Sequence, residues 1–142
     1  LVASGTTIGG RSSIYVPEED VLFSSDVVSH QGGGMRDANL GEWIRALEWI
    51  ESLPVKTIVP GHGDICGKDV VTRQKERMIS IKGMMEEALK KGLSKDETIE
   101  DESFQKFFRA DTSRGEYWLQ QRKETFRVGL ERVYDEVKAE TG

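Results

Sequence analysis

The sequence has little of several residue types on which common protein classes depend. It carries one cysteine, Cys66, in 142 residues, which excludes an internal disulfide and is typical of a reducing compartment, so we expect a cytoplasmic protein. No apolar run approaches the roughly 20 residues of a membrane span, and no segment resembles a signal peptide, so no membrane partner is expected. The sequence has only two histidines, His30 and His62.

Positive charge is also in short supply. Lysine and arginine number 20 against 25 aspartates and glutamates, for a net charge of −5. Nucleic-acid-binding proteins usually carry a basic stripe, whereas these cations alternate with glutamates along the second half, as on solvated helix faces. No nucleic-acid partner is therefore expected. The sequence has no nucleophile-elbow serine and no glycine-rich loop ending in Gly-Lys-Ser/Thr, and Gly32, Gly33 and Gly34 are read as a surface loop.

The chain divides at residue 67 into two different parts. In residues 1–67, segments 12–16 and 21–23 predict a β-hairpin around a turn, and segment 55–59 predicts a third strand. Residues 68–142 are expected to be helical and to pack on the same domain. Together they predict a small α/β fold with a thin sheet and a helical C-terminal tail.

Apolar residues at helical spacing predict the main helices. The first should be capped by Asp37 or Asn39 and ended by Pro54, and a capping box at residues 94–97 predicts a short later helix. A last helix should begin near Gly115. The expected buried faces are Leu40, Trp43, Ile44, Leu47 and Ile50; Val71, Met78, Ile81, Met85 and Leu89; and Leu119, Phe126, Leu130, Val133 and Val137.

Two polar residues follow predicted strands in the manner of metal ligands. His62 lies between Gly61 and Gly63, directly after a proline-ended strand, and the glycines let the backbone turn sharply. Asp26 ends the apolar run that starts at Val21. Each residue alone also fits a surface histidine or a turn aspartate. Together, at the ends of neighbouring strands, they indicate a single cleft.

Other residues that can carry chemistry have simpler interpretations. His30 is read as a loop histidine and Cys66 as a small buried residue. Trp43, Trp49 and Trp118 are read as packing residues on helices. Tyr15 is read as part of the core.

Several segments resemble the second half of metallo-β-lactamase-superfamily hydrolases, the group that includes glyoxalase II and related thioesterases and lactonases. Residues 13–26 resemble the family hairpin that ends in Phe-x-Gly-Asp, and residues 37–47 resemble the helix that follows it. Residues 57–63 resemble its last metal-ligand loop, and residues 130–134 the end of its closing helix. The resemblance implies the C-terminal half of an αββα sandwich.

The resemblance also implies a function. In the family the aspartate bridges two metal ions and the histidine binds one of them, which makes Asp26 and His62 the metal ligands here and zinc, or another divalent ion, the expected cofactor. A water held by such metals attacks a carbonyl or ester. The implied activity is hydrolysis of small esters, thioesters or lactones.

The chain also departs from the family pattern. The His-x-His-x-Asp-His signature is absent, threonine (Thr6 or Thr7) stands where a Gly-His-Thr turn is usual, and Ser25 replaces the glycine before the aspartate. Because two ligands cannot close a zinc site, metal binding should be weak and the chain inactive without an N-terminal half. Since the chain begins at Leu1 rather than methionine, we expect that residues once preceded it.

Two roles therefore stay open: a portion of a hydrolase, or a non-catalytic half-fold that acts as a structural or self-association module. The sheet face that the other half would cover should expose apolar side chains. Such a patch favours association, so the expected partner is a second copy, as a homodimer, or the missing N-terminal half. An intact site would in addition take a small-molecule substrate.

Overall fold

The structure is a computed structural model and describes residues 2–4, 11–30, 34–108, 110 and 112–142. The glycine-rich stretch 31–33 and the Thr6-Thr7 departure lie outside the described residues. Within the described ranges, none of the helices combines the length and hydropathy that a membrane span requires.

The sheet contains four strands in the order β1-β2-β3-β4. β2 (Arg11–Val16) and β3 (Val21–Ser25) form the predicted antiparallel hairpin, and β4 (Thr57–Pro60) runs parallel to β3. The expectation of three strands was wrong, because β1 (Val2–Ser4) pairs with the outer edge of β2. Three residues are too few to show a strand alternation, so only the pairing reveals this strand.

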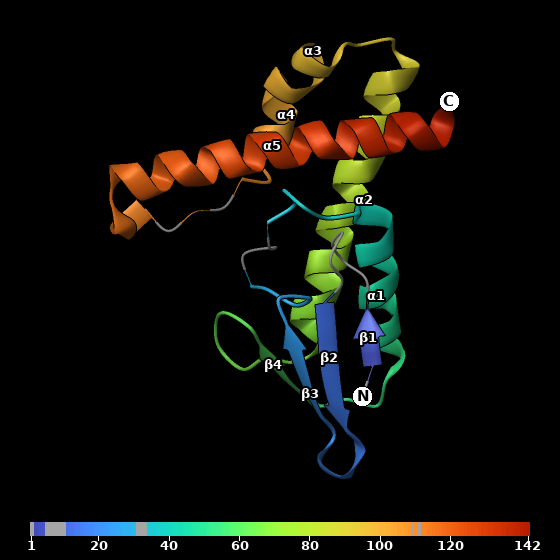
Figure 1. Ribbon diagram of the computed structural model, residues 1–142, viewed down its shortest axis with the longest axis vertical. Coiled ribbons are helices and arrows are strands. Elements are labelled where there is room, and N and C mark those ends of the chain that lie inside the picture. Colours follow the sequence, from blue (N-terminus) through green and yellow to red (C-terminus); the bar gives the residue numbers. More distant parts are fainter. Residues whose placement is uncertain (1, 5–10, 31–33, 109, 111) are drawn as a thin grey trace.

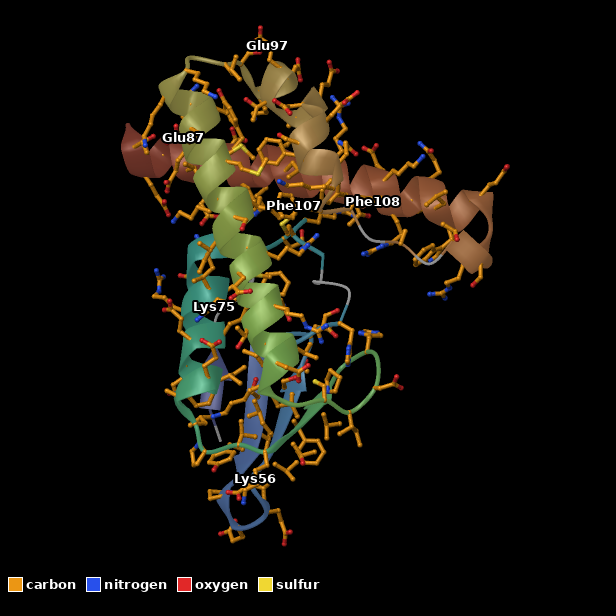
Figure 2. The ribbon with its side chains drawn as sticks, turned by 180° about the vertical axis from the view of Figure 1, so that it is seen from behind. Lys56, Lys75, Glu87, Glu97, Phe107 and Phe108 are labelled. Carbon is orange, nitrogen blue, oxygen red and sulfur yellow. The ribbon has the colours of Figure 1, made fainter. Side chains whose placement is uncertain are left out.

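α1 (Leu40–Ser52) and α2 (Lys68–Lys90) run side by side over one face of the sheet (Figures 1 and 2). Asn39 caps α1, since its side chain accepts a hydrogen bond from Glu42 N at 2.8 Å. The predicted apolar faces are confirmed, with Ile44 and Leu89 only half-buried at their margins. The fully buried centre of this layer is formed by Leu22, Ile58, Leu40, Leu47, Ile50, Val71, Met78, Ile81 and Met85.

The two helices are also joined by an ion pair. Glu51 of α1 accepts a hydrogen bond from Thr72 at 2.6 Å and pairs with Lys75, both on α2. Lys75 lies where α1 and α2 run side by side (Figure 2). The Lys75 ammonium and the Thr72 hydroxyl hold the pKa of Glu51 below its usual value, so the carboxylate stays charged at this interface.

The C-terminal region is helical, as expected. It contains α3 (Lys95–Glu100), α4 (Glu102–Gln105), the 3-10 turn η2 (Thr112–Arg114) and α5 (Glu116–Thr141). The capping box at Ser94 and Glu97 is confirmed. Figure 1 shows α5 crossing α2 and extending past it. The buried residues of α5 all lie in its second half, from Gly129 to Val137, whereas Leu119 and Phe126 are only half-buried.

The sheet face that α1 and α2 leave uncovered exposes apolar side chains. Ile14 on β2 is 50% exposed, and its cross-strand partner Phe23 on β3 is 47% exposed. Ile65, which follows β4, is 68% exposed. The expected apolar outer face is therefore present, while the homodimer remains a prediction.

Candidate metal-ligand pair and its cleft

The ends of the parallel strands β3 and β4 bring Asp26 and His62 together. His62 Nδ1 lies 2.8 Å from Asp26 Oδ1, a hydrogen-bonding distance. The Asp26 side chain is 39% exposed and that of His62 is 85% exposed, so both are open to a ligand. The structure thus unites the two residues that the sequence placed at neighbouring strand ends.

Close backbone approach makes this pairing possible. Gly61 N donates a hydrogen bond to Ser25 O at 2.8 Å, which fastens the His62 turn to the end of β3. A Cβ on Gly61 would lie 2.4 Å from Asp26 Oδ1 and 2.9 Å from the carbonyl carbon of Ser25. Glycine is needed here because any side chain would push Asp26 and the turn apart.

Ser25 also shows the effect of its departure from the family pattern. Its φ angle is 51°, in the left-handed region that favours glycine. The β3–β4 register also shifts between Phe23 and Ser25. This local twist turns the chain so that Asp26 leaves the sheet edge toward the His62 turn.

His30 lies in the same cleft, although its sequence context predicts an ordinary loop residue. Its Nε2 lies 2.8 Å from Asp64 O, and a Cβ on Gly63, which has φ 97°, would lie 2.9 Å from its ring. The spacing of four residues from Asp26 was the available signal. His30 therefore braces the His62 turn, and its ring is engaged by the Asp64 carbonyl.

A cleft of about 540 Å³, the Asp26–His62 cleft, opens over the pair. Its floor includes buried Trp43, whose indole donates to Val27 O at 2.8 Å. Its other side is formed by Arg114, Trp118 and Arg122 of η2 and α5. The volume is in the range of small-molecule sites. Trp118 was expected to pack inside the fold, but it is half-buried and lines this cleft.

Cys66 lies behind the His62 turn rather than in the cleft. Its backbone exchanges two hydrogen bonds with Ile58, at 2.7 and 2.9 Å, and extends the sheet beyond β4. Burial raises the pKa of its thiol, and Asp69 raises it further. A thiol held in its neutral form is a poor metal ligand. Cys66 was expected to be a small buried residue, and it is only half-buried.

The pair fits part of a metal site. In a tetrahedral zinc site with bonds of about 2.0–2.1 Å, two ligand atoms lie roughly 3.3 Å apart. The Asp26 and His62 atoms, now 2.8 Å apart, would have to separate by about 0.5 Å to admit an ion. Within the part of the chain described, no three or more histidine, cysteine, aspartate or glutamate side chains gather as a site. These residues alone do not complete one.

Comparison with known proteins supports the fold. No protein-family model matches the chain, and no curated protein gives a significant match. Among solved structures, the metallo-β-lactamase VMB-1 is 24% identical with a TM-score of 0.47, over 54% of this chain and 38% of its own. That score is too low to establish a common fold.

A double mutant of the sec-alkyl sulfatase PisA1 is 13% identical, with a TM-score of 0.65 over 92% of this chain. The match covers 22% of the sulfatase, so this chain spans well under half the length of either solved protein. At this identity the likeness concerns the fold alone. Over the matched region the chain shares the fold of part of the sec-alkyl sulfatase.

Proposed function

We propose that this chain is the C-terminal portion of a metallo-β-lactamase-fold hydrolase that acts on small esters, thioesters or lactones. The observation that carries the proposal is the 2.8 Å approach of His62 Nδ1 to Asp26 Oδ1 at the ends of two parallel strands. These residues would supply two ligands to a divalent metal, with zinc the expected ion. The remaining ligands would come from a segment outside the described residues.

A bound divalent metal would supply a water of lowered pKa as the nucleophile. The part assigned to this chain is to hold two ligands at a fixed separation. The Gly61–Ser25 hydrogen bond and the His30–Asp64 contact hold the turn that carries His62. Because two ligands bind zinc weakly, the chain by itself is proposed to be inactive.

Zinc titration by calorimetry tests the proposal. We expect weak, substoichiometric binding to the wild-type chain that a chelator removes, and its loss in Asp26→Asn and in His62→Gln. Asp64→Asn is the matched control, because Asp64 is exposed and contacts His30 through its backbone oxygen rather than its carboxylate. Equal zinc binding in all four proteins would refute the ligand assignment, as would two tightly held metals per chain.

The exposed apolar sheet face favours a second role, a self-association module in which two copies pack sheet on sheet. Ile14 and Phe23 form a directly opposed pair on this face, and apolar patches of this kind mark interfaces on proteins. Light scattering of the wild type and of Phe23→Ser tests it. A concentration-independent monomer of about 16.0 kDa for the wild type would exclude the homodimer.

A further inference from the structure

One side of the Asp26–His62 cleft is a cationic wall, defined as Arg114, Trp118 and Arg122. Trp118 and Arg122 are spaced by four on α5, so they share one side of that helix, and Arg114 precedes it on η2. The Arg114 guanidinium lies 4.9 Å and that of Arg122 5.7 Å from the centroid of the Trp118 ring. The indole thus holds two cations in place by cation–π contact. Both arginines line the cleft that contains Asp26 and His62.

Two carboxylates, Asp26 and Asp37, line the same cleft as this wall. Among the described residues, neither arginine forms an ion pair, although both approach Trp118. The Nε atom of Arg122 is buried and has no hydrogen-bond partner within the same residues. Leaving a buried donor of a charged group unsatisfied is costly. An anion in the cleft would give this donor an acceptor.

The rest of α5 fixes the wall in place. Glu136 accepts hydrogen bonds from Leu40 N and Gly41 N at 2.8 and 2.9 Å, and Arg132 donates to Ala38 O at 2.9 Å. One turn further toward the cleft, Gly129 packs against Met35 so closely that a Cβ would lie 2.9 Å from Met35 Cβ. These contacts continue along one stripe of α5 toward Arg122. Trp118 and Arg122 therefore stand on a long helix that is anchored through its second half, and Arg114 stands on the turn η2 before it.

We propose that the cationic wall binds the anionic group, a carboxylate, phosphate or sulfate, of the small molecule that enters the cleft. The inference deepens the proposed function and rests on it for the reaction: the anionic end would lie on α5 and the bond to be cleaved at Asp26 and His62. Arg36, which also lines the cleft and is exposed, adds a third positive charge. Guanidinium groups match the planar oxygens of such anions in a two-pronged geometry.

Anion binding to the metal-free chain tests the wall separately from the metal pair. After treatment with a chelator and its removal, the chain is titrated with inorganic phosphate, sulfate and acetate at constant ionic strength. The indole N–H signal of Trp118 is followed by NMR, assigned by its disappearance in Trp118→Phe. The variants are Arg114→Gln, Arg122→Gln and the double variant. Lys123→Gln is the control, because it removes one charge from the same helix at an exposed position.

We expect saturable shifts of the Trp118 signal in the wild type and in Lys123→Gln. Each arginine variant should bind about tenfold more weakly, which corresponds to roughly 1.4 kcal/mol. Shifts that do not saturate in the wild type, or equal affinity in the double variant and the wild type, would overturn the proposal. Arg122→Lys, which keeps the charge, guards against an unfolded variant: it should retain more affinity than Arg122→Gln. The zinc affinity of the same arginine variants should equal that of the wild type. Loss of anion binding alone therefore reports on the cationic wall, and loss of zinc binding alone reports on Asp26 and His62.

Discussion

Replacing Gly61 by alanine tests the geometry that joins Asp26 to His62. The new Cβ would lie 2.4 Å from Asp26 Oδ1 and 2.9 Å from the carbonyl carbon of Ser25. The carboxylate can rotate away, but the Ser25 backbone cannot move without losing its 2.8 Å hydrogen bond to Gly61 N. The substitution should therefore lower both the free energy of unfolding and the affinity for zinc.

The magnitude follows from two opposing effects. Overpacking of this kind costs about 1–3 kcal/mol. Alanine also restricts the unfolded chain, which returns about 0.4–1 kcal/mol, so the net loss of stability should be about 1–2 kcal/mol. Urea denaturation followed by circular dichroism measures it. The loss should be accompanied by weaker zinc binding, because Asp26 is displaced.

The control is Gly83→Ala in α2. A Cβ there meets nothing within 4 Å, and alanine is the better helix former, so the free energy of unfolding should rise by about 0.5–1 kcal/mol. Equal effects at Gly61 and Gly83 would refute the close approach of the His62 turn to Asp26.

Three further substitutions test other parts of the structure. Ser25→Gly should raise the free energy of unfolding by about 0.5–1 kcal/mol, since it relieves a left-handed φ of 51°; a lower midpoint in urea would contradict this. Glu136→Ala should cost about 1–2 kcal/mol because it leaves Leu40 N and Gly41 N at the start of α1 without their partner, whereas exposed Glu124→Ala should change little in the same thermal melts. Glu51→Gln should flatten the acid limb of stability: since folding lowers the pKa of Glu51 below 4.5, its contribution is present above the unfolded-state pKa and is lost as pH falls through the folded value. Urea midpoints of wild type and variant that fall in parallel between pH 6 and pH 3 would refute this.

Local patterns were sufficient to predict most of the elements. The apolar spacing from Leu40 to Ile50 defined α1, and the reciprocal Ser94–Glu97 cap defined the start of α3, because both signals lie within a few residues. β1 was missed because its three residues are ordered only by pairing with β2. The strand predicted at residues 55–59 begins instead at Thr57, where pairing with Val21 of β3 starts.

The candidate site was predicted in part for a similar reason. Asp26 and His62 each end a strand, which is a local signal, and parallel pairing of β3 and β4 brings them together. The cationic wall could not be predicted, because it depends on contacts between α5 and residues 35–41 that are more than 90 positions away in the chain. Nothing in the spacing of Arg114, Trp118 and Arg122 indicates what they face.

Zinc titration followed by NMR of the imidazole nitrogens tests the metal-ligand pair most directly. The chain has only two histidines, so the His62 and His30 signals can be assigned by substituting either one. The account predicts that zinc shifts a ring nitrogen of His62 strongly, that Asp26→Asn weakens this shift, and that the His30 ring, held by Asp64 O, changes little. A shift confined to His30, or a His62 response that is the same with and without the Asp26 carboxylate, would contradict it.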